Sequence, residues 1–110
     1  MLDVRLYLLQ RLSAMVMAPL VLVHIAMMIY AVQDGLTATE ILSRTQGSLL
    51  WALFYGSFVM AVSVHAAIGL RVIVFEVARL KGPALTLFTW AAFVGLLYLG
   101  MQAVYAVTAS

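Results

Sequence analysis

Three long apolar runs constrain the fold of this chain more than any other feature of its sequence. They extend from about residue 13 to 32, from 48 to 75 and from 84 to 107. Each reaches the roughly 20 residues that an α-helix needs to cross about 30 Å of hydrocarbon. A spanning segment must satisfy its backbone hydrogen bonds internally, and three strands are too few to close a barrel. The sequence therefore predicts an all-α membrane protein, with three transmembrane helices forming a single domain over residues 1–110.

Composition excludes several other classes of protein. Hydrophobic residues make up 66% of the 110 residues and charged residues 9%, and a chain this short cannot bury so much apolar surface within itself. A soluble enzyme and a disordered chain are therefore both excluded. Because there are no cysteines, the chain cannot supply a disulfide, a thiolate nucleophile or iron–sulfur ligands. A net charge of +2 is too small for a nucleic-acid surface.

The connections between the runs predict the orientation in the membrane. Residues 33–47 are polar with a short amphipathic pattern, which is typical of one interfacial turn of helix, and residues 76–83 end in a Gly-Pro helix stop and restart. The first connection carries only Arg44, whereas the other basic residues flank the opposite ends of the runs: Arg5, Arg11, Arg71, Arg79 and Lys81. By the positive-inside rule this bias predicts a cytoplasmic N-terminus and a periplasmic C-terminus.

His65 is the ionisable residue in the second run that most strongly suggests a cofactor. Ala61 and Gly69 lie four residues to either side of it, so small residues flank the imidazole on one helix face. A neutral imidazole is a good iron ligand, and helix bundles commonly hold cofactors between facing helices. Arg71 lies about 9 Å further along the helix, at a position suited to a porphyrin propionate. The alternative is a histidine that bonds to a neighbouring helix, with Arg71 reaching to the interface.

His24 is the second candidate ligand. It follows Ser13 by eleven residues, about three turns, so the two side chains share a face of the first helix. Counted from the cytoplasmic side, His24 lies roughly 20 Å beyond Arg11, so it is expected at a different depth from His65. The two histidines therefore fit two stacked redox sites, or one site and one packing histidine, better than one shared iron.

Arg11 and Ser13 form a third group, at the cytoplasmic mouth of the first run. A guanidinium and a hydroxyl there suit a quinone carbonyl or a lipid phosphate. The alternative is an ordinary positive-inside arginine beside a helix-capping serine.

Two motifs resemble the membrane anchor subunits of succinate dehydrogenase and fumarate reductase. The run Gln10–Ala14 (QRLSA) resembles their H-R-x-S-G signature. The run His65–Arg71 (HAAIGLR), followed by Glu76, resembles their H-x-x-x-G-[IL]-R-x-x-x-x-D motif. The order, spacing and span positions of the two motifs, together with three predicted spans, make the resemblance specific.

The resemblance implies a role for each candidate residue. It implies that His65 is an axial ligand of haem b beside Gly69, with Arg71 on the haem propionates. It also implies that Arg11 and Ser13 line a quinone site next to the iron–sulfur subunit. Members with two haems have a histidine that follows the motif serine by eleven residues, which would make His24 a ligand of a second haem iron.

The chain departs from the family pattern at several positions. Gln10 replaces the usual histidine before the arginine, and Ala14 replaces the glycine. Glu76 replaces the aspartate, and Val77 stands where the small anchor subunit carries a quinone-binding tyrosine. Val72 stands where many large anchor subunits carry a second histidine. The missing tyrosine argues against the small anchor subunit, and the prediction is the large, cytochrome b type of anchor even though Val72 departs from it.

The implied protein is a non-dehydrogenase subunit of succinate:quinone oxidoreductase or quinol:fumarate reductase in the bacterial cytoplasmic membrane. It would pass electrons between the iron–sulfur subunit and quinone, while a flavoprotein subunit carries the dehydrogenase chemistry. The bundle, and the second ligand of a bis-histidine haem, would be completed by a second anchor chain or a second copy of this one. The alternatives are a haem-free anchor, a small structural or assembly protein, and a proton-conducting subunit. The last is disfavoured because no Asp or Glu continues a relay within the runs.

Overall fold

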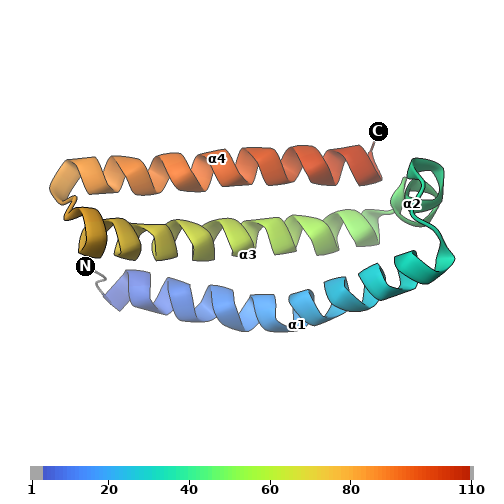
Figure 1. Ribbon diagram of the computed structural model, residues 1–110, viewed down its shortest axis with the longest axis horizontal. Helices are drawn as coiled ribbons and strands as arrows, with labels where there is room; N and C mark the ends of the chain where they lie inside the picture. The colour runs from blue at the N-terminus through green and yellow to red at the C-terminus, as the bar shows by residue number, and fades with distance from the viewer. Residues whose placement is uncertain (1–3, 110) are drawn as a thin grey trace.

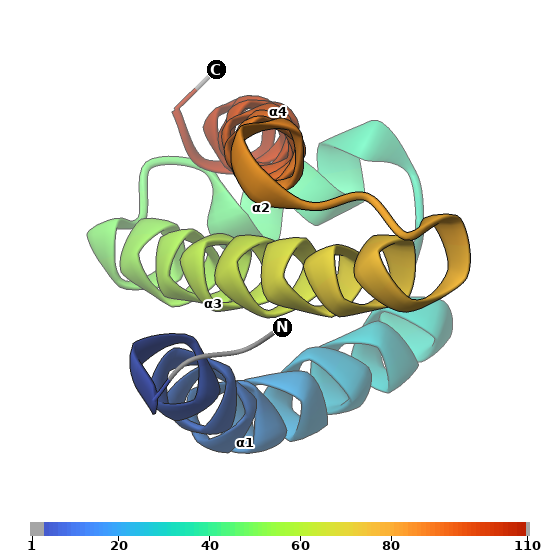
Figure 2. The same ribbon diagram turned by 90° about the vertical axis from the view of Figure 1, so that its left-hand side faces the viewer.

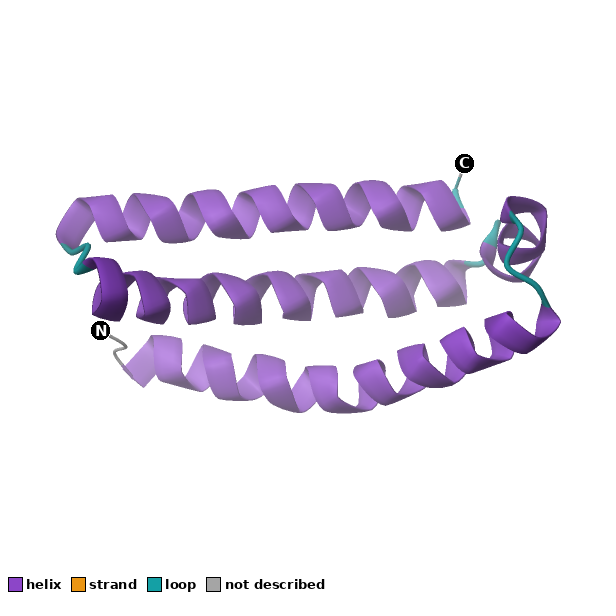
Figure 3. Cartoon of the chain, viewed as in Figure 1, coloured by secondary structure: helices purple, strands orange, loops and turns teal. Residues whose placement is uncertain are grey.

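The computed structural model describes residues 4–109, and within that range it contains helices and loops but no strand (Figure 3). The elements are α1 (Val4–Asp34), α2 (Ala38–Thr45), α3 (Leu49–Ile73), the π-helical turn η1 (Val74–Ala78) and α4 (Gly82–Thr108). The helix α1, the helix α3 extended by η1, and the helix α4 are each long and apolar enough to cross a membrane. The all-α, three-span prediction is therefore confirmed, with residues 1–3 and 110 of the predicted domain outside the described range.

Helix α3 lies between α1 and α4 and packs against both (Figures 1 and 2). Helix α1 begins at Val4, nine residues before the predicted span, because a helix can continue past the hydrocarbon and the hydropathy pattern detects only the apolar part. Pro19 lies inside α1, where it removes one backbone hydrogen bond and favours a bend. The curved path of α1 in Figure 1 follows from it.

Small residues let α3 approach its neighbours closely. Ala61 and Ala67 are buried in α3, and a Cβ placed on Gly100 of α4 would overlap the side chain of Val59. Close packing of this kind is the usual source of helix association in lipid, where the hydrophobic effect does not drive one helix onto another.

The connection between α1 and α3 contains the short helix that the sequence predicts. The Thr37 hydroxyl caps α2 by accepting from the Glu40 backbone N–H at 3.2 Å. Arg44 donates to Asp34 Oδ2 at 2.6 Å and to the carbonyl of Gly35 at 2.8 Å. Gly35 has a φ of +142°, a conformation that side-chain-bearing residues rarely adopt. These contacts fix how the chain turns from α1 into α2.

The end of α2 caps the end of α4. The Thr45 hydroxyl donates to the carbonyl of Val107 at 2.6 Å, and the backbone N–H of Gly47 donates to the carbonyl of Thr108 at 2.7 Å. The last carbonyls of a helix have no partner within it. Here the first connection supplies those donors.

Candidate functional site

His65 of α3 faces α1, where its imidazole meets the hydroxyl of Ser13. The distance from Ser13 Oγ to His65 Nδ1 is 3.4 Å, and Ser13 is buried at 7% exposure. The Ser13 hydroxyl donates its proton to the carbonyl of Gln10 at 3.0 Å. Its oxygen is therefore free to accept a hydrogen bond from Nδ1–H, and in that tautomer the lone pair lies on His65 Nε2. No described residue hydrogen-bonds to that Nε2.

Gln10 and Gly69 lie beside this pair. A Cβ on Gly69 would lie 3.8 Å from Gln10 Nε2, so Gly69 faces α1 at the level of the His65 contact. Gln10 Oε1 is buried and has no hydrogen-bond partner. Buried polar atoms are nearly always satisfied, so the surroundings of His65 contain an acceptor that no residue within 4–109 uses.

His24 packs among aromatic rings at another level of the same interface. Its ring centroid lies 5.3 Å from that of Phe58 and 6.2 Å from that of Tyr55, both in edge-on geometry. His24 Nδ1 is buried, and no described residue hydrogen-bonds to it. Phe58 precedes His65 by seven residues, which corresponds to about 10 Å along α3. Ser13 and His24 thus share the α3-facing side of α1, and the two histidines lie at different levels, as predicted.

Arg71 takes a different direction from His65. Its Nη1 donates to Thr89 Oγ1 of α4 at 3.2 Å, and that hydroxyl donates to the carbonyl of Leu85 at 2.8 Å. Arg71 Nε is buried without a partner. The structure therefore places Arg71 against α4 and His65 against α1, and it does not bring the two together. Thr89 was not singled out from the sequence, although it follows Lys81 by eight residues and Arg71 precedes Arg79 by eight, on either side of the short connection into α4.

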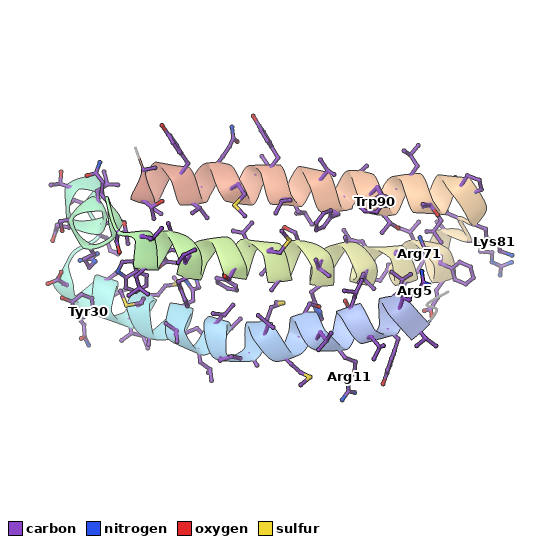
Figure 4. All side chains as sticks on the ribbon, turned by 180° about the vertical axis from the view of Figure 1, so that it is seen from behind. Arg5, Arg11, Tyr30, Arg71, Lys81 and Trp90 are labelled. Atoms are coloured by element: carbon purple, nitrogen blue, oxygen red, sulfur yellow. The ribbon has the colours of Figure 1, made fainter. Side chains whose placement is uncertain are left out.

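Arg11 and Ser13 are also not brought together. Ser13 is buried against α3, whereas Arg11 is exposed and points away from the bundle (Figure 4). Residues two positions apart on an α-helix point in directions that differ by about 200°, so Arg11 and Ser13 lie on nearly opposite sides of α1. A ligand that Arg11 binds would therefore approach from outside the three helices.

Residues 4–109 contain no group of three or more His, Cys, Asp or Glu side chains that could hold a metal ion. A haem iron requires only axial ligands from the protein, and His65 Nε2 is an atom of that kind.

Comparison with known proteins identifies the family. Residues 1–104 match the family described as succinate dehydrogenase/fumarate reductase transmembrane subunit. Comparisons with curated proteins and with solved structures gave no significant match. The family match covers nearly the whole chain, including all three spanning helices and both sequence motifs. The chain therefore belongs to the succinate dehydrogenase/fumarate reductase transmembrane subunit family.

Proposed function

We propose that this membrane anchor subunit ligates haem b through His65 and contributes Arg11 to a quinone site. Bound there, haem b supplies a one-electron centre between the iron–sulfur subunit and quinone. The flavoprotein and iron–sulfur subunits carry the oxidation of succinate or the reduction of fumarate. The chain itself holds them at the membrane and sets the surroundings of the haem.

The observation that carries the haem proposal is the contact between Ser13 and His65. A metal-ligating histidine almost always donates its other ring N–H to an oxygen, which fixes the tautomer and the orientation of the ring. Ser13 Oγ, at 3.4 Å from His65 Nδ1, is in position to accept that proton. His24 has no such partner on Nδ1. The proposal therefore assigns the haem to His65.

The surroundings of His65 fit a haem, which is a flat ring with polar groups at its edge. Gly69 presents no side chain beside the imidazole, and Gln10 Oε1 offers a buried acceptor that has no other partner. His24 is about 10 Å away along the helix axis, too far to be the second ligand of the same iron. A second anchor chain, or a second copy of this one, would supply that ligand.

Replacing Ser13 tests the haem assignment without removing the ligand. In the Ser13→Ala complex we expect haem affinity to fall about 10- to 100-fold, because the imidazole loses the acceptor that fixes its tautomer. The reduction potential of the remaining haem should shift as well. Both are measured from dithionite-reduced minus oxidised spectra of the purified complex, during haem titration and redox titration.

Two variants control this experiment. Ser13→Thr keeps a hydroxyl at the site and should retain the wild-type potential. Ser57→Ala removes an exposed hydroxyl from α3 and should change neither affinity nor potential. A fully assembled wild-type complex without b-type absorbance would instead identify a haem-free anchor, in which the Ser13–His65 contact only joins two helices.

Arg11 supports the quinone part of the proposal because it is exposed at the N-terminal end of α1, where a partner subunit can meet it. A guanidinium there can donate to a quinone carbonyl and stabilise the charge that reduction places on that oxygen. The same end carries most of the basic residues of the chain. We therefore propose that it faces the cytoplasm, with the C-terminus in the periplasm.

Sealed membrane vesicles test the orientation and the role of Arg11 together. Succinate added outside should support quinone reduction in inside-out vesicles and not in right-side-out ones. Arg11→Ala should lower that rate about 100-fold, the typical effect of losing one donor to a developing oxyanion. Succinate oxidation by a soluble dye, which bypasses the quinone, should be unchanged. Equal rates of quinone reduction in wild type and Arg11→Ala would remove Arg11 from the quinone site.

A further inference from the structure

A cavity of about 480 Å³ lies among α1, α3 and α4 at the end of the bundle that carries Arg5 and Arg71. Both arginines line it, together with Thr89 and Trp90 of α4. Figure 4 shows Arg5 and Arg71 close together at this end, with Trp90 on the neighbouring helix. This charged cavity includes neither His65 nor Ser13 among its lining residues.

The charge in this cavity is not balanced by the described part of the chain. Its lining contains two guanidinium groups and no carboxylate. The contact of Arg71 with Thr89 is to a neutral hydroxyl, and Arg71 Nε is buried without a partner. An arginine within a spanning helix normally pairs with an anion or with backbone carbonyls. The cavity is therefore suited to a negatively charged group.

A second, open cavity adjoins this charged end. Its volume is about 530 Å³, and it is lined mostly by apolar side chains, with Ser13 and Ser57 also in its lining. Leu9 and Val64 line both cavities. Met60, in the second cavity, precedes Arg71 by eleven residues, or about 16 Å along α3. That is about half of the roughly 30 Å of a bilayer core, the depth of one leaflet.

We propose that this paired cavity binds one anionic phospholipid, with the phosphate between Arg5 and Arg71 and an acyl chain directed towards Met60. A phosphate satisfies two guanidinium groups by charge-assisted hydrogen bonds. An uncharged lipid, a quinone head or an apolar helix would leave both cations uncompensated. Trp90 suits the headgroup level, where aromatic side chains are enriched. The site stands on these contacts and does not depend on haem ligation.

Native mass spectrometry of the purified complex tests this site. The complex is exchanged in detergent with equal amounts of palmitoyl-oleoyl phosphatidylglycerol and the phosphatidylcholine with the same chains. The wild type should retain one phosphatidylglycerol per chain with a preference of about tenfold or more, because each basic residue near a membrane surface contributes a severalfold effect. The Arg5→Gln/Arg71→Gln variant should lose that preference, and Arg5→Lys/Arg71→Lys should keep it.

A matched variant removes the same charge elsewhere. Arg79 and Lys81 lie at the same end of the bundle but do not line the cavity, so Arg79→Gln/Lys81→Gln should retain phosphatidylglycerol as the wild type does. Equal retention of the two lipids by the wild type, or unchanged retention in Arg5→Gln/Arg71→Gln, would overturn the proposal. So would displacement of the lipid by inorganic phosphate, since the acyl chain would then contribute nothing.

The haem spectrum of the same samples separates this site from the haem site. The lipid proposal expects Arg71→Gln to lose phosphatidylglycerol while the b-type absorbance stays at the wild-type level. Loss of absorbance with full retention of the lipid would assign Arg71 to haem propionates and contradict the lipid site. A wild type that lacks haem but still selects phosphatidylglycerol would support the lipid site alone.

Discussion

The His65→Ala complex is expected to lose more than about 90% of its b-type haem absorbance, because the replacement removes the axial nitrogen that the proposal assigns to the iron. The neighbouring groups cannot substitute for it. The Ser13 hydroxyl and the Gln10 amide are weak iron ligands, and the lining of the α1–α3 contact offers no second imidazole at that level. The measurement is the dithionite-reduced minus oxidised spectrum of the purified complex, normalised to the flavin content of the partner subunit.

The matched replacement is His24→Ala, which removes the same side chain from the same helix pair about 10 Å away. It should retain the full signal, since the ring of His24 packs edge-on against Phe58 and Tyr55. A partial loss in His24→Ala would show a second haem at that level. Wild-type absorbance in His65→Ala would remove His65 as the ligand.

Gly100→Ala is expected to destabilise the packing of α3 against α4 by about 1–3 kcal/mol, the usual effect of overpacking a close contact. The new methyl group would overlap Val59. A valine in a helix is largely restricted to one rotamer, so Val59 cannot turn aside and the two helices must separate. The free energy of unfolding is measured by SDS titration of the complex in mixed micelles, followed by circular dichroism.

The same helix provides the control for this substitution. A Cβ on Gly95 would meet nothing within 4 Å, so Gly95→Ala should be neutral, or stabilising by up to about 1 kcal/mol through helix propensity. Shortening the partner side chain in Val59→Ala/Gly100→Ala should recover much of the loss, as a non-additive pair in direct contact does. Equal effects of Gly95→Ala and Gly100→Ala would contradict the close approach.

The spanning helices could be predicted from the sequence because hydropathy reports the solvent that surrounds each segment. The start of the first helix could not. Helix α1 begins at Val4, where Arg5 and later Arg11 interrupt the apolar pattern without interrupting backbone hydrogen bonding. The short helix α2 was predictable for a different reason, since its amphipathic pattern and the Thr37 cap are both local features.

The site could be predicted only as far as a single helix determines it. Residue counting placed Ser13 and His24 on one face of α1, and it separated the levels of the two histidines. It could not show that Ser13 meets His65, because that contact depends on how α1 is set against α3. The pairing of Arg71 with Thr89 was missed for the same reason. Arg11 and Ser13 were grouped by proximity in sequence, although residues two positions apart on a helix point in nearly opposite directions.

The hydrogen bonds that the first connection donates to the end of α4, from Thr45 and Gly47, have a consequence for biosynthesis. The donors, on Thr45 and Gly47, leave the ribosome before α3 and α4, whereas the acceptors on Val107 and Thr108 emerge only after α3 and nearly all of α4. The donors of the first connection therefore have no carbonyl acceptors on α4 until two further spans have been inserted. These hydrogen bonds can form only when the third span has entered the membrane. A nascent chain that stalls before that point lacks them.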